Sequence, residues 1–319
     1  MIRRQMNRRQ MLLAGMAGLG SLVAIRGLRA SPGSSAAAAG AGTLTIGGDL
    51  TVNRMGFGAM RLTGEGIWGE PRDPAEARRV LRRAVDLGVN FIDTADAYGP
   101  EVNERLIAET LHPYPRGLVI ATKGGQTRPS AGQWVPDGRP EHLRAACQGS
   151  LKRLKLERID LYQFHWPDPK VPVEESVGEL ARLRTEGKIR HVGVSNFSVD
   201  ELQRVRRIVP IVSVQNRYSV TARDSEGAVE ACEQQGLAFI PWFPLDAGGI
   251  AKDVLADVAA AHDATPIQVA LAWLLHHSEA MLPIPGTSSV EHLEENVAAG
   301  TLRLSEHELE RLDELGGAN

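Results

Sequence analysis

Four side chains that can hold or transfer protons follow three hydrophobic segments of the chain. They are Asp93, Tyr98, Lys123 and His165, found in FIDTADAYG, VIATKGG and LYQFHWPD. Each residue alone fits an ordinary structural role, such as a helix cap or a solvated lysine. Four such roles at matching positions would be a coincidence, so the sequence predicts that these side chains form one catalytic site.

This combination suits a reaction in which a carbonyl carbon receives a hydride, because the resulting alkoxide needs a proton at once. Tyrosine has an ordinary pKa of about 10 and exchanges protons reluctantly near neutral pH. We predict that Tyr98 is the general acid and that the ammonium group of Lys123 lowers its pKa. Asp93 is then the partner that holds Lys123. A neutral His165 donates the hydrogen bond that orients the carbonyl group.

Short β-branched runs alternate with amphipathic helical patterns from Thr43 onward. The opening TLTIGGDLTVNR predicts a β-hairpin that turns at Gly47-Gly48-Asp49. Eight continuous apolar runs then predict strands buried on both faces. The expected strands are Met55–Gly58, Asn90–Thr94, Leu118–Thr122, Asp160–His165, His191–Ser195, Val212–Gln215, Ala238–Pro241 and Leu282–Ile284. Helices are expected from Pro74 and near 101–110, 140–155, 173–187, 198–208, 223–235 and 266–277.

The first helix shows how the local signals agree. Asp73 is the expected N-cap, Pro74 takes the first helical position, and Glu76 is spaced to complete a capping box before Gly88 ends the helix. Eight strands, each followed by helical sequence, predict an α/β fold. We expect a single (β/α)8 TIM barrel over 43–319 with an N-terminal β-hairpin and an active site at the carboxyl ends of its strands. An open, doubly wound sheet is the alternative. No G-x-G-x-x-G motif follows the first strand, which counts against it.

Residues 1–42 are expected to be a signal and linker rather than part of the barrel. They comprise a basic head, an apolar run over 11–25 and a Ser/Ala/Gly tract. Arg8-Arg9, followed by Gln-Met-Leu, resembles a twin-arginine export signal, with cleavage expected within 36–39. The apolar run is too short and too rich in glycine for a stable membrane span after processing. We therefore expect an exported, periplasmic protein. A mistaken start or a retained anchor is the alternative, and the protein would then be cytoplasmic.

The charge distribution argues against a nucleic-acid partner. Residues 1–42 hold six of the 36 basic residues and no acid, which leaves 30 basic against 39 acidic residues in the remainder. Such an acidic body lacks the basic surface that phosphate backbones require. The two cysteines, Cys147 and Cys232, are far apart in the sequence and predict buried thiols rather than a disulfide or a cysteine metal site.

Six ordered motifs resemble the aldo-keto reductase superfamily across 43–319. They are FIDTADAYG, ATKGG, QFHWPD, GVSNF, VQNRYS and IPGTSSVEHLEEN. The resemblance implies an NADP(H)-dependent enzyme that reduces an aldehyde or ketone with the four roles given above. It also implies hydrogen bonds to the nicotinamide carboxamide and an aromatic ring stacked on the nicotinamide. The residues implied at this end of the cofactor are Ser195, Asn196 and Gln215, with Trp242 as the stacking ring and Phe243, Pro244 and Leu245 beside it.

The other end of the cofactor is expected after the last strand, where a loop leads into a helix. Ser288 and Glu291 are spaced as a capping box, and exposed amides at such a helix start suit the adenosine 2′-phosphate. The residues implied here are Gly286, Thr287, Ser288, His292, Glu295 and Asn296. His292 stands where many family members have an arginine, and Gly286 stands at a frequent lysine position. NADP(H) is therefore the preferred cofactor, and NAD(H) is a possible one.

Four segments resemble the bacterial pyridoxal reductase branch, namely FGAMRLTGEGIWGEPRD, VQNRYS, PWFPL and IPGTSSVEHLEEN. This resemblance implies an aromatic aldehyde as the small-molecule carbonyl substrate. Aromatic side chains would suit its binding site. The candidates are Trp68, Trp134, Trp166 and Phe243. Two other classes of function remain open. A metal-dependent barrel hydrolase would need a ligand cluster such as H-x-H at a strand end, and the sequence has none. A non-enzymatic NADP(H)-binding redox sensor would use the same barrel without turnover. The oligomeric state has no signature in the sequence.

Overall fold

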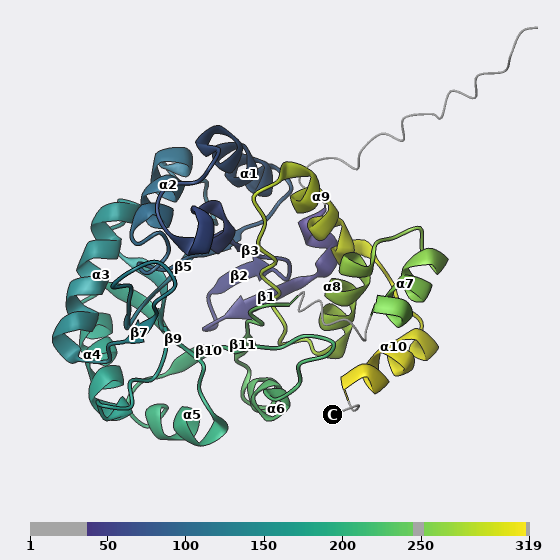
Figure 1. The fold of residues 1–319 in the computed structure, drawn as a ribbon. Helices are drawn as coiled ribbons and strands as arrows, with labels where there is room; N and C mark the ends of the chain where they lie inside the picture. Colours follow the sequence, from purple (N-terminus) through teal and green to yellow (C-terminus); the bar gives the residue numbers. More distant parts are fainter. Residues whose placement is uncertain (1–36, 245–251, 317–319) are drawn as a thin grey trace, which may run out of the picture. The chain divides into compact units, whose positions relative to one another are not determined.

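Seven parallel strands form the central sheet of the computed structural model, which describes residues 37–244 and 252–316 (Figure 1). Their spatial order is β11-β10-β9-β8-β5-β4-β3. In chain order the strands are β3 (Phe57–Gly58), β4 (Phe91–Asp93), β5 (Val119–Gly124), β8 (Ile159–Phe164), β9 (Ile189–Ser195), β10 (Ile211–Gln215) and β11 (Ala238–Phe239). Nearly all of their residues are buried, as the continuous apolar runs predict.

The eighth predicted strand closes the sheet into a barrel without forming a regular ladder. On one side, the Leu282 amide donates to Phe239 at 2.8 Å. On the other, the Gly56 and Gly58 amides donate to Pro283 and Pro285 at 2.9 and 3.4 Å. Both prolines lack an amide hydrogen, so the segment cannot donate at these positions. The curled sheet with its surrounding helices confirms the α/β TIM-barrel fold, and the open doubly wound alternative is wrong.

The helices lie outside the strands (Figure 1). They are α1 (Pro74–Asp86), α2 (Val102–Leu111), α3 (Pro140–Leu154), α4 (Val173–Thr185), α5 (Val199–Val205), α6 (Glu226–Gln235), α7 (Lys252–Ala261), α8 (Pro266–His277), α9 (Val290–Ala298) and α10 (Glu306–Asp313). The sequence analysis omitted α7 and α10. A usable signal existed for α10, because Ser305 and Glu308 form a complete capping box at its start.

An antiparallel hairpin precedes the barrel, as predicted. Strands β1 (Thr43–Ile46) and β2 (Leu50–Asn53) pair in register from Thr43 opposite Asn53. Three of its side chains, Ile46, Leu50 and Val52, join the apolar cluster inside the barrel. At the turn, the Asp49 Oδ1 atom is hydrogen-bonded to Nε2 of His191, a residue of β9, at 2.6 Å. The hairpin therefore covers the amino-terminal ends of the strands and leaves their carboxyl ends for the site.

The structured body begins before Thr43. Residues 38–41, which the sequence analysis assigned to the linker, form the 3-10 helix η1 (Ala38–Ala41). The side chains of Ala38 and Ala41 are buried, and the Ala38 amide donates to Leu87 at the end of α1 at 3.1 Å. Small methyl groups permit this close packing, so an alanine-rich tract is part of the body here. The remainder of the predicted leader, 1–36, lies outside the described residues.

Two helix starts differ from their predicted capping. Asp73 caps α1 by accepting from the Glu76 amide at 2.9 Å, as predicted. The Glu76 carboxylate does not return to Asp73. It accepts instead from the Val290 amide at 3.1 Å and so caps α9. The N-cap of α9 is Ser289 rather than Ser288, one residue later than the predicted capping box.

Within the described ranges, no single helix is long and apolar enough to cross a membrane. One pair, Asp253–Ala261 with Pro266–His277, passes that test only when taken together and is bent by 88°.

The hairpin turn gives a test of this packing. Both Gly47 and Gly48 have positive φ angles, 62° and 83°. A Cβ on Gly47 would lie 2.4 Å from the His191 ring, whereas a Cβ on Gly48 would have no neighbour within 4 Å. We expect Gly48→Ala to lower the free energy of unfolding by about 1 kcal/mol, through backbone strain alone. Gly47→Ala should cost about 1–3 kcal/mol more, because the ring must move. Urea unfolding of both variants measures the difference, and equal losses would contradict this account of the turn.

Candidate active site

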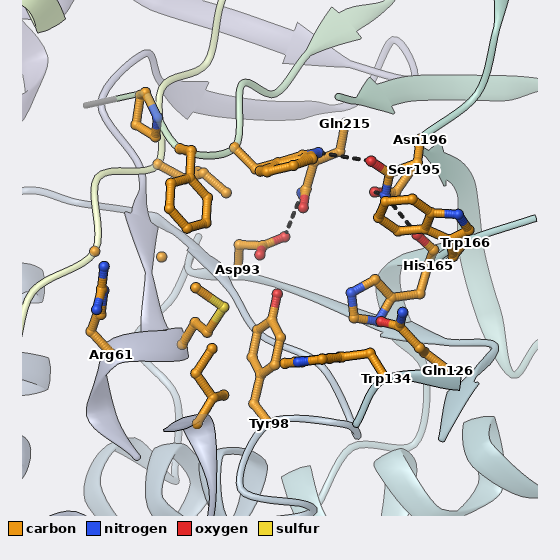
Figure 2. Close-up of a pocket in the computed structure, with 18 of the residues that line it drawn as sticks. Arg61, Asp93, Tyr98, Gln126, Trp134, His165, Trp166, Ser195, Asn196 and Gln215 are labelled. Carbon is orange, nitrogen blue, oxygen red and sulfur yellow. Dashed lines mark hydrogen bonds between the residues drawn. The ribbon is translucent and has the colours of Figure 1, made fainter. Parts of the chain in front are cut away.

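The polar residues that end the barrel strands meet at one end of the barrel (Figure 2). Asp93 is the last residue of β4, Lys123 lies one residue before the end of β5, and His165 directly follows β8. Tyr98 reaches the same place from the loop after β4. The four residues predicted from their types and spacing therefore lie together, because parallel strands direct their carboxyl ends to the same rim.

The centre of the site is a buried ion pair. Lys123 is completely buried, and Asp93 is 2% exposed. The Lys123 Nζ atom donates to Asp93 Oδ1 at 2.5 Å, to the Thr94 carbonyl oxygen at 3.0 Å and to the Tyr98 hydroxyl at 3.3 Å. Each hydrogen of the ammonium group thus has an acceptor, and one of those acceptors is the phenol.

Two glutamine side chains hold the other carboxylate oxygen of Asp93. Gln163 Nε2, from β8, donates to Oδ2 at 3.0 Å, and Gln215 Nε2, from β10, donates to it at 2.8 Å. Gln215 was predicted only as a cofactor contact. In the structure it lines the cavity and also fixes the carboxylate, so it connects the buried ion pair to the cavity.

The phenol keeps its proton in this setting. Burial raises the pKa of Tyr98, and this effect outweighs the lowering by the Lys123 charge. Lys123 does lower this pKa, as predicted, but the sequence analysis did not include the cost of burying a phenolate, and that cost sets the net direction of the shift. Burial alone would lower the pKa of Lys123, but the charge of Asp93 raises it above its ordinary value. The pair is thus a neutral phenol beside an ammonium ion.

The imidazole of His165 is neutral, as predicted. Burial, and secondly the charge of Lys123, hold the pKa of this side chain well below its ordinary value. Its ring lies 5.9 Å from the Tyr98 ring between centroids, edge to face. Its Nδ1 atom is buried without a hydrogen-bond partner among the described residues. A neutral imidazole can donate to a ligand oxygen without carrying a second positive charge into the site.

A cavity of about 770 Å³ opens in front of these residues. Most of the predicted site lines it (Figure 2). The predicted residues in its wall are Asp93, Tyr98, Trp134, His165, Trp166, Ser195, Asn196, Gln215, Trp242, Phe243, Pro244 and Gly286. Lys123 lies behind the wall, against Asp93 and Tyr98. Leu245 lies outside the described residues.

Side chains that follow β9 and β11 are hydrogen-bonded to each other at the cavity. Asn196 has a left-handed backbone with φ of 62° and donates from Nδ2 to the His165 carbonyl oxygen at 3.1 Å. Its Oδ1 atom accepts from the indole nitrogen of Trp242 at 3.0 Å. The predicted carboxamide contact and the predicted stacking ring thus hold each other in place. Ser195, beside them, is 1% exposed.

Several predicted contacts lie outside the described cavity wall. They are Trp68, Thr287, Ser288, His292, Glu295 and Asn296. Trp68 instead lies over the guanidinium group of Arg128, 5.6 Å from it. Of the other five, Thr287 and Ser288 lie in the loop before α9, and His292, Glu295 and Asn296 lie along α9 itself. At the start of α9, the Val290 amide donates a hydrogen bond to the Glu76 carboxylate, and the Ser289 amide donates one to Thr287 Oγ1. The helix start predicted to receive a phosphate therefore already holds one negative charge.

The sequence analysis also missed residues that line the cavity. They are Gly58, Met60, Arg61, Ile67, Gln126, Pro136 and Ile284. Arg61 is the only lysine or arginine that the described residues contribute to the wall, and it is exposed. Gly58 and Ile284 end predicted strands but carry no polar side chain that would single them out, and the other five reach the site through the segments that follow β3 and β5.

The described part of the chain contains no group of three His, Cys, Asp or Glu side chains that could hold a metal ion. Both cysteines are buried free thiols, as predicted, and burial raises the pKa of each to about 12.

Comparisons with known proteins show the family to which this chain belongs. The aldo/keto reductase family model matches residues 54–316. An uncharacterized oxidoreductase of Schizosaccharomyces pombe is 49% identical over 89% of this chain and 92% of its own length. Pyridoxine 4-dehydrogenase of Escherichia coli is 43% identical over 85% of this chain and 97% of its own. An aldo-keto reductase from Klebsiella pneumoniae, solved in complex with NADPH, superposes with a TM-score of 0.73 at 27% identity, covering 86% of this chain and 94% of that one. The chain belongs to the aldo/keto reductase family and is an oxidoreductase.

Proposed function

We propose that this enzyme reduces an aldehyde or ketone to an alcohol with NADP(H), and that Tyr98 is its general acid. The observation that carries the proposal is the Tyr98 hydroxyl, which faces the cavity and accepts a hydrogen bond from the buried Lys123 ammonium group at 3.3 Å. A neutral phenol at this point can deliver a proton to an oxygen in the cavity. The neighbouring ammonium ion stabilises the phenolate that is left.

The cavity fits the nicotinamide end of such a cofactor. Ser195 and Gln215 present almost fully buried polar groups to it, and Trp242 presents an indole. A carboxamide needs such donors and acceptors, and a flat ring needs an aromatic surface. Gly58 and Gly286 also line the cavity, and neither can carry a side chain there, since a Cβ on either would come within 2.7 Å of a carbonyl oxygen. The NADPH complex of the Klebsiella pneumoniae relative supports the choice of nucleotide. When bound, NADPH supplies the hydride.

The chain's own residues then handle the proton and the carbonyl oxygen. His165, held neutral by burial, donates a hydrogen bond that orients the oxygen. Tyr98 donates its proton to that oxygen. Lys123 remains charged throughout because Asp93 and the two glutamines fix the ion pair. In the oxidative direction, Tyr98 receives the proton back. The same residues therefore serve both directions.

An aromatic aldehyde of the pyridoxal type is the substrate class that we propose. The cavity wall includes Trp134, Trp166 and Phe243, and the latter two are 40% and 47% exposed. Partly exposed aromatic rings beside a cavity suit a flat, partly polar ligand. The printed name of the Escherichia coli relative, pyridoxine 4-dehydrogenase, supports the same class.

A redox sensor that binds NADP(H) without turnover is the alternative. It would need the nucleotide contacts but would have no use for a phenol hydrogen-bonded to a buried ammonium ion.

We further propose that the twin-arginine-like leader exports the folded enzyme to the periplasm, since Arg8-Arg9 precedes an apolar run. A reduced cofactor would then have to be regenerated there by the substrate cycle itself. A second pair of arginines, Arg3-Arg4, provides an internal control.

Replacing Tyr98 tests the general acid. We expect Tyr98→Phe to keep NADPH binding, measured by fluorescence titration, while aldehyde-dependent NADPH oxidation falls by about 10²–10⁴-fold. Tyr114→Phe is the matched control, because its hydroxyl donates to Leu154 on a helix. Turnover in Tyr98→Phe equal to that of the wild type would refute the assignment. Nucleotide binding by the wild type without turnover on any aldehyde would favour the sensor.

The charge at the start of α9 controls the choice between NADPH and NADH in this proposal. His292→Arg adds a permanent, forked cation and should lower the Kd for NADPH relative to NADH by about tenfold. Glu76→Gln should shift the ratio in the same direction, because it removes the carboxylate at the Val290 amide. Glu109→Gln, which removes a charge that pairs with Arg78 on the surface, is the control. An unchanged ratio in both test variants would exclude the start of α9 from the cofactor site.

Export is tested with the full-length chain in a bacterial host. Changing Arg8-Arg9 to Lys-Lys should abolish the periplasmic fraction, measured by cell fractionation and NADPH-linked activity. The same change at Arg3-Arg4 should leave it intact. A wild-type chain found only in the cytoplasm would disprove export.

A further inference from the structure

A buried arginine outside the predicted site organises the substrate side of the cavity. Arg128 directly follows β6 (Gln126–Thr127), which forms a short antiparallel ladder with β7 (Val135–Pro136). The residue is 8% exposed, and burial lowers its pKa. No ion pair joins it to a carboxylate within the described ranges. A guanidinium group taken out of water needs other partners for its donors.

Those partners are backbone carbonyl oxygens from three loops. The Nε atom donates to Gln133 at 3.0 Å, and Nη2 donates to Gly66 at 3.0 Å. The Nη1 atom donates to Ile67 at 3.1 Å and to Ala97 at 3.3 Å. The planar fork of the guanidinium group therefore joins the loop after β3, the loop after β4 and the β6–β7 hairpin.

Three of these acceptors directly precede an aromatic residue near the active site. Ile67 precedes Trp68, Ala97 precedes Tyr98, and Gln133 precedes Trp134. Two of the rings also cover the cation. The guanidinium carbon lies 3.7 Å from the ring centroid of Trp134 and 5.6 Å from that of Trp68. One side chain thus fixes both the backbone and the ring of Trp134.

Trp134 in turn contacts the two residues that face the substrate oxygen. Its ring centroid lies 6.3 Å from that of Tyr98 and 6.3 Å from that of His165, edge to face in both pairs. Figure 2 shows the indole beside both side chains at the cavity. A shift of this ring would change the surface on which a flat substrate lies.

We propose that Arg128 is a positioning residue that holds Trp134 in place and thereby gives the enzyme its preference for aromatic over short aliphatic aldehydes. This inference rests on the proposed reductase function. An aromatic aldehyde packs its ring against the fixed indole, whereas a short aldehyde reaches Tyr98 and His165 without covering it. Lysine cannot replace Arg128, because an ammonium group has neither the fork for these carbonyls nor a flat surface for the indole.

The test compares Arg128→Lys with the wild-type chain, using pyridoxal and propanal as substrates. We expect the KM for pyridoxal to rise by about tenfold relative to the KM for propanal, which corresponds to about 1.4 kcal/mol of binding. A general loss of active enzyme lowers the maximal rate but leaves both KM values unchanged, so it does not affect this ratio. The Kd for NADPH should stay unchanged.

Arg54→Lys is the matched control. Arg54 also donates to backbone carbonyl oxygens, including those of Leu275 at 3.0 Å and Met281 at 3.1 Å, but at the amino-terminal ends of the strands. It should lower thermal stability and leave the KM ratio intact. Trp134→Leu is a second probe and should shift the ratio as Arg128→Lys does. The double variant should shift it no further, because both changes remove one arrangement.

The outcomes separate the inference from the function on which it rests. A wild-type chain that reduces neither aldehyde overturns the proposed function and this inference with it. A wild-type chain that reduces both, with an Arg128→Lys variant of the same KM ratio, overturns the inference alone. Additive shifts in the double variant also overturn it, since Arg128 would then act by a route other than Trp134.

Discussion

The fully buried ammonium group of Lys123 needs an opposite charge inside the barrel, because removing an ion from water costs roughly several kcal/mol. Asp93 provides that charge at 2.5 Å, and two glutamines from neighbouring strands satisfy its second oxygen. These contacts draw on β4, β5, β8 and β10, so four strands must keep their register for the pair to form. The barrel therefore positions the ion pair, and the ion pair limits how the strand ends can move.

The protonation state of the Tyr98 phenol depends on its burial beside this ion pair. Tyr98 is buried beside the ammonium group of Lys123. The pKa of the phenol is raised, because the effect of burial outweighs the stabilisation of a phenolate by that charge. The acid form is the one that a reduction requires. The same charge lowers the pKa of His165 further and helps to keep the imidazole neutral. Burial thus keeps both of these cavity-lining groups neutral, and the Lys123 charge reinforces that state only for the imidazole.

The sequence predicts the strands and the four central residues well, because both depend on local hydrophobic runs and on the polar residues that end them. Predictions fail where the conformation of loops determines which residues are in contact. Arg128 shows no pattern, since its acceptors belong to three separate loops. Glu76 has the spacing of a capping box for α1 but caps α9 instead. The direction of the Tyr98 pKa shift depends on the depth of burial, which spacing alone does not give. The predicted eighth strand, Leu282–Ile284, closes the barrel but does not form a regular strand, because its prolines prevent a ladder.

The cost of the buried pair also bears on the choice between an enzyme and a sensor. A nucleotide can be recognised by amides, hydroxyls and an aromatic ring, which the walls of this cavity provide without Lys123. The ammonium group lies behind that wall, where it contacts the phenol and the carboxylate rather than the cavity. Besides Asp93, its charge therefore acts on Tyr98 and His165, the two groups that we propose to donate a proton and to orient the carbonyl oxygen. A chain that only bound nucleotide would gain nothing from this arrangement, whereas a reductase depends on it.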